Sequence, residues 1–296
     1  MTQIQAIPVN TKATTARNVY SSLYFLEEAD LYKSEKPYLI AFGPEDHECP
    51  TTNIVAKEAA DVLIRDIRPQ LDTISFDVNG FTVTHVDSFP SIAEMQETTP
   101  RKSYFASVEQ AMKKDFGADR VQVIGHLLRK RDAMFPFATG EAYKHHQPIR
   151  IVHVDWTPRS IRDKIAAALG DRASQVLDKS TRNILASAWK PLNGTGRDWP
   201  LALCDATTFD PQNDLEPSDI VKAHGQEEKC QVYERERYRW HFLSDQRADE
   251  VLLFRAYDSK AAVHEGIPHG SFYDPAAAEN EVPRESIELH VLMWWK

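Results

Sequence analysis

Segments with the alternation of a β-strand occupy much of the C-terminal half of the chain, and they constrain the fold more than any other feature. Polar and apolar residues alternate along QVYERERYRWHF (231–242), and VLLFRAY (251–257) and SIELHVLMWW (286–295) have strand-like composition. VQVIGH (121–126) and PIRIVHVDW (148–156) add further strands. The pattern predicts an α+β fold in which a mainly β core carries a helical cover.

Helices are predicted before and between these strands. Thr157-Pro158 directly follows the strand that ends in VHVDW, and threonine at the N-cap with proline at the first helical position favours a helix start there. Apolar spacing and capping residues together predict helices over residues 53–67, 103–116, 159–169 and 172–189.

A turn signal in the first part of the chain completes the predicted architecture. Residues 77–80 lie between two alternating segments and predict the turn of a β-hairpin. We expect one domain spanning residues 1–296, in which a helix-and-hairpin extension (1–120) packs on a β core formed by residues 121–296.

The charge balance restricts the partners that the chain can bind. Its formal net charge is −9 at pH 7, which argues against nucleic acid and against an anionic membrane surface. No apolar stretch approaches the length that spans a bilayer. We therefore expect a small-molecule substrate and neither nucleic acid nor a membrane as a partner, and a homodimer is compatible with the sequence.

Cysteine usage indicates a reducing compartment. Cys49, Cys204 and Cys230 are an odd number of widely spaced thiols, which gives neither a disulfide framework nor a zinc pattern. The first twenty residues lack the apolar core of a secretory signal. We expect a cytoplasmic protein.

Three residues far apart in the sequence are candidate metal ligands. His153 and Asp155 are two residues apart in a predicted strand, so their side chains project from the same face. An H-x-D pair alone is a weak indication, since a His–Asp hydrogen bond at a strand end explains it as well. His269, in GIPHGSFYDP, supplies a second imidazole. Two imidazoles and one carboxylate are the ligand set that holds one face of an iron(II) ion.

Arg284 and Ser286 follow His269 at the start of a predicted strand and share one of its faces. A guanidinium binds a carboxylate through two parallel hydrogen bonds, and a hydroxyl can add another. The competing interpretation is a surface arginine that begins an edge strand. In combination with the candidate ligands, the pair predicts a binding site for a dicarboxylate cosubstrate.

These groups together predict an oxygen-activating enzyme. Three protein ligands on one face of iron(II) leave positions for the carboxylate and keto oxygens of a 2-oxo acid and for O2. The cofactor carries the oxidation, while the protein orients the groups and excludes water. His153, Asp155 and His269 would be the catalytic metal site, and Arg284 with Ser286 would bind 2-oxoglutarate.

Several motifs resemble the AsaB- and CmcJ-like hydroxylase/desaturase family, which comprises iron(II)- and 2-oxoglutarate-dependent oxygenases of secondary metabolism. The similarity covers most of the chain from about residue 65 to about residue 290, and HVDWTP with PHGSF and PRESIE is its most specific part. The similar stretches are RDIRP (65–69), DVNGF (77–81), RKRDAMFP (129–136), HVDWTP (153–158), WKPL (189–192), PLALCD (200–205), DEVLLFRAYDS (249–259), PHGSF (268–272) and PRESIEL (283–289).

The resemblance implies a double-stranded β-helix, the jelly-roll or cupin-like fold. It implies iron ligands at His153, Asp155 and His269, with 2-oxoglutarate held by Arg284. The implied reaction is hydroxylation, desaturation or cyclisation of a small secondary metabolite or an amino-acid-like substrate.

One departure from the family pattern bears on substrate choice. Where the family has Asn-x-Trp-Arg before Pro-Leu, this chain has Ser187-Ala188-Trp189-Lys190, which removes planar hydrogen-bonding groups. Trp156, Trp189 and Arg131 are candidates for pocket walls, although core packing or a structural salt bridge explains them as well.

Two other functions remain compatible with the sequence. A metal-dependent, cupin-type oxygenase would bind its substrate directly to the metal and would need no 2-oxo acid, so Arg284 would be dispensable. A non-catalytic relative would bind a small ligand in the same scaffold without redox chemistry.

Overall fold

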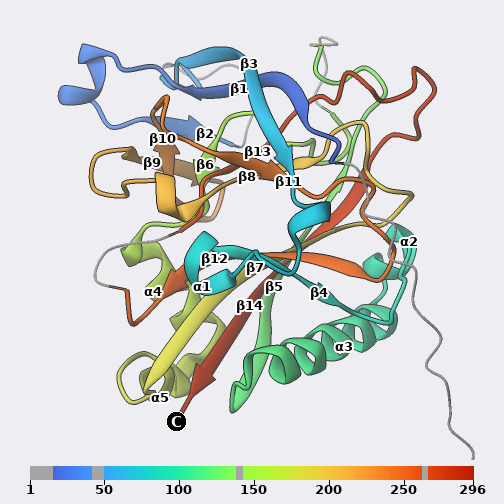
Figure 1. Cartoon of the computed structure of the whole chain (residues 1–296). Coiled ribbons are helices and arrows are strands. Elements are labelled where there is room, and N and C mark those ends of the chain that lie inside the picture. Colours follow the sequence, from blue (N-terminus) through green and yellow to red (C-terminus); the bar gives the residue numbers. More distant parts are fainter. Residues whose placement is uncertain (1–15, 42–49, 138–142, 262–265) are drawn as a thin grey trace, which may run out of the picture.

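Two β-sheets that face one another form the body of the protein (Figure 1). The structure, a computed structural model, describes residues 16–41, 50–137, 143–261 and 266–296. Helices cover the outer side of one sheet and one end of the stack. The fold is mixed α+β with mostly β-structure, as the strand patterns predicted.

The larger sheet curls back toward its own centre. It is formed by β1 (Val19–Leu26), β2 (Tyr38–Ile40), β3 (Ala56–Asp66), β6 (His153–Val154), β8 (Leu201–Cys204), β9 (Leu215–Lys222), β10 (Gly225–Val232), β11 (Trp240–Phe242) and β13 (His269–Ser271). The strand order is β1-β3-β11-β8-β13-β6-β10-β9-β2. The edge strand β1 also bridges the middle of the sheet, through Tyr24 to Ile151 and through Leu26 to Tyr233.

The smaller sheet is antiparallel throughout. It is formed by β4 (Phe81–His85), β5 (Arg120–Lys130), β7 (Arg182–Pro191), β12 (Glu250–Asp258) and β14 (Glu285–Trp295). The order β4-β12-β7-β14-β5 puts the last strand of the sequence between two earlier ones.

The helices pack on the smaller sheet and beside it (Figure 1). Helix α3 lies along the outer face of the sheet, and α4 and α5 cover one end of the stack. The α-helices are α1 (Phe76–Asn79), α2 (Ile92–Gln96), α3 (Thr98–Phe116), α4 (Pro158–Leu169) and α5 (Ala173–Leu177). Short 3-10 turns lie at Asp30–Lys33, Arg68–Gln70, Gly170–Arg172 and Ala206–Thr208.

The two faces of the smaller sheet have different partners. Ala186, Ala188 and Leu289 point outward and pack with Val108 and Met112 of α3. The opposite face joins a second apolar cluster between the sheets, to which the larger sheet also contributes. This inner space also contains polar side chains, and the site described below lies there.

Several predicted elements occur where the sequence indicated them. The helix predicted at 103–116 is the major part of α3, and it ends at Gly117, which adopts the left-handed conformation (φ 62°). The helix predicted at 159–169 is α4, with Thr157 as N-cap and Pro158 as its first residue. The strands predicted at 251–257 and 286–295 are β12 and β14.

The helix predicted at residues 53–67 is wrong, because this segment is strand β3. The register against β1 shifts between Ser21 and Leu23, and Asp61 has a positive φ of 55°. Such a bulge inserts an extra residue into the strand. Inward-facing residues, which recur at every second position in a regular strand, are therefore three positions apart at the bulge. That spacing, from Ala59 to Val62, mimics the period of a helix.

The helix predicted at residues 172–189 is also wrong beyond its first turn. Helix α5 ends at Leu177, and strand β7 begins at Arg182. All residues of β7 after Arg182 are buried, because β7 has neighbours on both sides and packing on both faces. A strand of this kind is a continuous apolar run, which periodicity alone cannot distinguish from a buried helix.

Two smaller predictions are corrected as well. Residues 77–80 do not turn a hairpin: α1 occupies the predicted turn, and β4 pairs with β12. Residues 231–242 are not one strand, since β10 ends at Val232 and β11 begins at Trp240. Between them, Arg235 and Arg237 both bind the buried carboxylate of Asp214, and these ion pairs accompany a turn of the chain.

The first part of the chain contributes strands to both sheets. Strand β3 pairs with β11 in the larger sheet, and β4 pairs with β12 in the smaller one. Cys204 and Cys230 are buried free thiols, while Cys49 lies outside the described residues. Within the described ranges, no helix combines the length and the apolar character needed to cross a membrane.

Candidate active site

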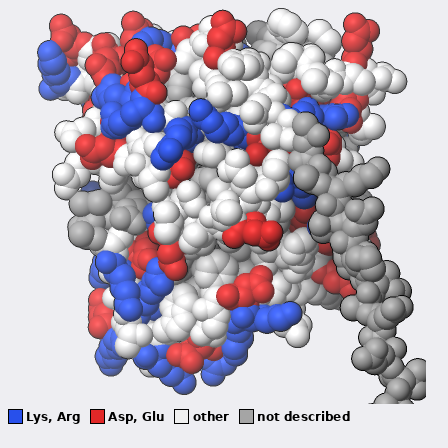
Figure 2. All heavy atoms as spheres, viewed as in Figure 1, with Lys and Arg blue, Asp and Glu red and all other residues white. Residues whose placement is uncertain are grey.

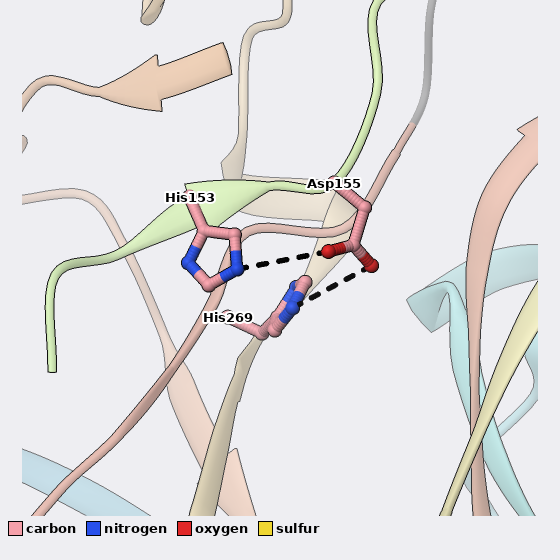
Figure 3. Close-up of side chains that lie close together, drawn as sticks. All are labelled: His153, Asp155 and His269. Atoms are coloured by element: carbon pink, nitrogen blue, oxygen red, sulfur yellow. Dashed lines mark ion pairs between the residues drawn. The ribbon is translucent and has the colours of Figure 1, made fainter. Parts of the chain in front are cut away.

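Three side chains predicted as metal ligands meet between the two sheets (Figure 3). His153 lies on β6, Asp155 follows that strand, and His269 begins β13, where it pairs directly with His153. The Nε2 atom of His153 is 3.6 Å from Asp155 Oδ1, and that of His269 is 3.7 Å from Asp155 Oδ2. All three potential ligand atoms lie within 4.8 Å of one another, and all three residues are buried.

Backbone carbonyls fix which ring nitrogen faces the centre of this group. His153 Nδ1 is 2.9 Å from the carbonyl oxygen of Ile151, and His269 Nδ1 is 2.9 Å from that of Ile267. A carbonyl oxygen only accepts hydrogen bonds, so Nδ1 carries the proton in both rings. Each Nε2 therefore directs a lone pair toward the Asp155 carboxylate.

This arrangement fits a cation better than a hydrogen-bond network. Burial lowers the pKa of His153 to about 4, with a further contribution from His269, so its imidazole is neutral near pH 7. Burial would raise the pKa of Asp155, but positive charge on His269, His153 and Lys229 holds it well below its usual range, so the carboxylate is ionised. The two Nε2 atoms and this carboxylate converge on one point, and they are the donor set of a non-haem iron(II) site.

Asp155 has two further polar neighbours. Ser187 of β7 donates a hydrogen bond to Oδ2 at 3.2 Å, and the ammonium of Lys229 on β10 lies 3.5 Å from Oδ1. Both contacts orient the carboxylate from outside the ligand group. The ring of Phe254 also packs against that of His269, with 4.6 Å between the ring centroids.

Arg284 is a buried cation without an acidic side-chain partner among the described residues. Its side chain is 1% exposed, and Nη1 donates to the carbonyl of Trp199 and to Ser271 Oγ, the latter at 3.1 Å. The Nε atom of Arg284 has no hydrogen-bond partner among the residues that the structure describes. Burial lowers the pKa of Arg284 to about 9, yet the guanidinium remains protonated near neutral pH. A buried guanidinium in this state fits an incoming carboxylate.

Ser286 and Arg131 lie close to the same arginine. The buried hydroxyl of Ser286 has no hydrogen-bond partner within the described ranges, so it remains able to bind a ligand. Arg131 pairs instead with Asp198, with Nε 2.5 Å from Oδ2, and the same Asp198 oxygen accepts the backbone N–H of Arg284. The salt bridge of Arg131 therefore supports the backbone at Arg284.

Known proteins resemble this chain over most of its length. A family model described as an oxidoreductase/YMDC permease-like domain matches residues 23–294. The Fe(II)/2-oxoglutarate-dependent dioxygenase nvfI of Aspergillus novofumigatus is 31% identical over 239 residues, which are 79% of this chain and 82% of that protein. The chain belongs to this oxygenase family.

A second relative and a solved structure agree with this assignment. The oxygenase is 30% identical to the alpha-ketoglutarate-dependent dioxygenase tstK of Talaromyces stipitatus, over 79% of this chain and 84% of that one. Its structure is similar to that of the iron and alpha-ketoglutarate-dependent endoperoxidase NvfI, with a TM-score of 0.78 and 28% identity. That similarity covers 95% of this chain and 98% of the other.

Sequence reasoning missed some polar residues near the site of this oxygenase. Glu288 and His290 extend the row of Ser286 along the inner face of β14, with Glu288 Oε1 3.7 Å from His290 Nε2. The His290 ring also packs edge-on against Trp156 at 4.6 Å. Their alternate spacing after Ser286 was the only local signal that they share a face.

The segment 187–190 contributes to the site on one face only. Ser187 contacts Asp155, and Trp189 packs beneath Arg284, whose Cζ lies 5.4 Å from the ring. Lys190 points the other way and donates to the carbonyls of Ser88 and Ala248. The exchange of the family's arginine for Lys190 therefore lies outside the ligand group.

Proposed function

We propose that this oxygenase uses iron(II), 2-oxoglutarate and O2 to hydroxylate, desaturate or cyclise a small molecule, with His153, Asp155 and His269 as its iron ligands. The observation that carries the proposal is the convergence of two imidazole lone pairs and a carboxylate on one buried point. The names of the relatives, which include iron- and 2-oxoglutarate-dependent dioxygenases and an endoperoxidase, support the same chemistry.

Bound iron would supply O2-dependent oxidation of a substrate carbon, coupled to decarboxylation of 2-oxoglutarate. The protein's contribution is orientation. The carbonyls of Ile151 and Ile267 fix the two imidazoles, and Ser187 fixes the Asp155 carboxylate. Burial of the three ligands keeps bulk water away from the reacting groups.

We propose that Arg284 and Ser286 bind the distal carboxylate of 2-oxoglutarate. Within the described chain, Arg284 has a guanidinium edge and Ser286 a hydroxyl without hydrogen-bond partners, so both have capacity for an anion. Trp189 and the carbonyl of Trp199 hold the guanidinium from the other sides. A dicarboxylate bound in this way is fixed at one end, which orients the 2-oxo acid end.

Several wider proposals accompany this function. The two facing sheets, with the ligand group between them, are consistent with a double-stranded β-helix that extends over a single domain of residues 1–296. Acidic and basic side chains are interspersed on the face seen in Figure 2, and the net charge of −9 favours a small molecule over nucleic acid. We expect a cytoplasmic enzyme, and a homodimer is the first assembly to test.

The proposal is tested by loading the protein anaerobically with iron(II) and 2-oxoglutarate, admitting O2, and measuring succinate. We expect iron-dependent succinate formation that increases when a true substrate is added. His153→Ala and His269→Ala should abolish it while the thermal unfolding of the metal-free protein changes little. His145→Ala, at an exposed position, is the matched control.

Two results would contradict the proposal. If substrate turnover needs the metal but consumes no 2-oxoglutarate, and Arg284→Ala retains activity, the enzyme is a cupin-type oxygenase without a 2-oxo acid. If the protein takes up no iron under anaerobic conditions, it is a small-ligand-binding relative without redox chemistry.

A further inference from the structure

A cavity of about 570 Å³ lies beside the contacts of Arg284, and its walls include several aromatic rings. Phe137 and Tyr273, which are 70% and 51% exposed, both line this one cavity, so two large exposed rings lie at the same opening. Tyr24, Phe135 and Trp199 line it more deeply. Its size and lining are those of a site for one small organic molecule.

Among the described residues, Arg150 is an arginine of this cavity that forms no ion pair, although Glu279 and Glu281 also line the cavity. The guanidinium of Arg150 lies over the ring of Tyr24 at 4.0 Å and faces the ring of Trp199 at 6.0 Å. Its Nε is buried and has no hydrogen-bond partner in the described part of the chain. The other arginine in the cavity, Arg131, differs because it is paired with Asp198.

The position of Arg150 favours ligands with a particular shape as well as a negative charge. The close contact with the Tyr24 ring restricts the guanidinium, whose Nε is a free donor that can bind a planar anion. A buried donor without a partner is disfavoured unless a ligand or water completes it. The surrounding aromatic walls favour a ligand that is itself flat and apolar apart from its anionic group.

Two residues that line the cavity also contact Arg284 of the candidate active site. Ser271 lines the cavity and accepts a hydrogen bond from Arg284, while the carbonyl of Trp199 accepts another. Ser271 also lies two residues after His269 on β13, so both side chains point to the same face of that strand. A molecule held in the cavity therefore lies along the strand face that carries a ligand of the proposed metal.

We propose that this cavity is the substrate site, and that the substrate is a flat, largely apolar molecule with one carboxylate or acidic enol, which Arg150 binds. The inference rests on the proposed oxygenase function and adds the substrate class to it. Arg150 is a positioning and specificity-determining residue, because it holds the end of the substrate that is not oxidised.

Binding of two probes of equal shape tests the substrate class without turnover. 2-Naphthoate carries the anionic group, and 2-naphthamide is its neutral counterpart. Calorimetric titrations with saturating 2-oxoglutarate, in the metal-free and in the anaerobic iron-loaded protein, should give tighter binding of the acid. Arg150→Gln should weaken binding of the acid by roughly 10- to 100-fold, as expected for loss of a charge-assisted hydrogen bond, and should leave the affinity for the amide unchanged.

Further variants identify which feature of the cavity binds the acid. Arg150→Lys keeps the charge but not the planar stacking, so it should restore only part of the affinity for the acid. Phe137→Ala, at an exposed position, should weaken both probes alike. Arg159→Gln makes the same charge change in a different cavity, beside α4, and is the matched control. Thermal unfolding of each variant checks that the fold is kept.

The outcomes are distinguishable from those of the proposed function. Equal binding of acid and amide, or acid binding that Arg150→Gln does not weaken, would overturn the substrate class. Loss of acid binding in Arg284→Met but not in Arg150→Gln would show that the probe occupies the 2-oxoglutarate site, which also overturns it. Failure of iron uptake would contradict the oxygenase function, whereas the metal-free titration would still report on the cavity.

Discussion

At the scale of single residues, Ser187 has the simplest measurable role. Its hydroxyl donates to Asp155 Oδ2 at 3.2 Å from a strand of the opposite sheet. Partners of this kind typically contribute 10- to 100-fold to metal affinity, so Ser187→Ala should weaken anaerobic iron(II) binding by about tenfold. Ser107→Ala, which removes a hydroxyl bonded to Ser103 on α3, is the control. Unchanged affinity in Ser187→Ala would show that Asp155 needs no support from β7.

The buried side chain of His241 on β11 leads to a second prediction at this scale. Neither of its ring nitrogens has a hydrogen-bond partner among the residues described. Burial lowers the pKa of His241 from 6.5 to about 4, and the nearby carboxylate of Asp205 only partly opposes this effect. The unfolded chain binds this proton below about pH 6.5 and the folded protein only below about pH 4. Stability is therefore lost as the pH falls between these values.

The magnitude follows from the same two pKa values. At a pH of about 5, His241 should reduce the free energy of unfolding by roughly 2 kcal/mol relative to neutral pH. The variant His241→Phe keeps a ring beside Phe81 but has no group that titrates there. Its free energy of unfolding should therefore fall by roughly 2 kcal/mol less than that of the unchanged protein between neutral pH and a pH of about 5. Urea unfolding at both pH values measures it, and equal losses in the two proteins would contradict the argument.

The sequence located part of the site at this scale. His153 and Asp155 are two residues apart in a predicted strand, so their spacing alone predicted that their side chains project from the same face. Ser187 and Lys229 could not be found in this way, because they reach Asp155 only through the pairing of distant strands. No local pattern encodes which strand will lie opposite.

At the scale of elements, α1 and the segment before β13 depend on each other. Gly80 ends α1 with φ 83°, and a methyl group added there would lie 2.1 Å from Ile267 Cδ1. The carbonyl of Ile267 accepts the Nδ1–H of His269. A change at the end of a short helix can therefore reach a proposed iron ligand.

Gly80→Ala should reduce both stability and iron affinity. The left-handed backbone and the overpacking together should lower the free energy of unfolding by roughly 2–4 kcal/mol. Gly117→Ala is the matched control, since Gly117 has φ 62° but open space around it, so only about 1–2 kcal/mol should be lost, without an effect on iron. Urea unfolding and anaerobic iron titration measure the two effects. Equal losses in both variants would show that contact with Ile267 is unimportant.

Elements were predictable where local signals dominate. Thr157, Pro158 and Gly117 mark the ends of α4 and α3, because capping depends on neighbouring residues alone. Strands β3 and β7 were mistaken for helices, since the bulge at Asp61 and the burial of both faces of β7 arise only from their partners. The curling of the larger sheet likewise follows from long-range bridges.

At the scale of the whole molecule, metal binding should stabilise the fold. His153 and His269 lie on neighbouring strands of the larger sheet, and Ser187 links their common partner Asp155 to the smaller sheet. Manganese(II) at about one hundred times its dissociation constant should add about 2.7 kcal/mol, which corresponds to a rise of roughly 5–10 °C in Tm. His153→Ala should abolish the rise, and a chelator should reverse it. A rise that persists in His153→Ala would place the ion elsewhere.

The position of β14 has a consequence for biosynthesis. This strand follows the other described strands in the sequence, yet it fills the gap between β7 and β5 and directly follows Arg284. Until residues 285–295 have been made, β5 is thus separated from the other three strands of the smaller sheet. A nascent chain should therefore expose the apolar edge of β7 to chaperones until β14 has been synthesised, and the proposed cosubstrate site at Arg284 and Ser286 can form only after that.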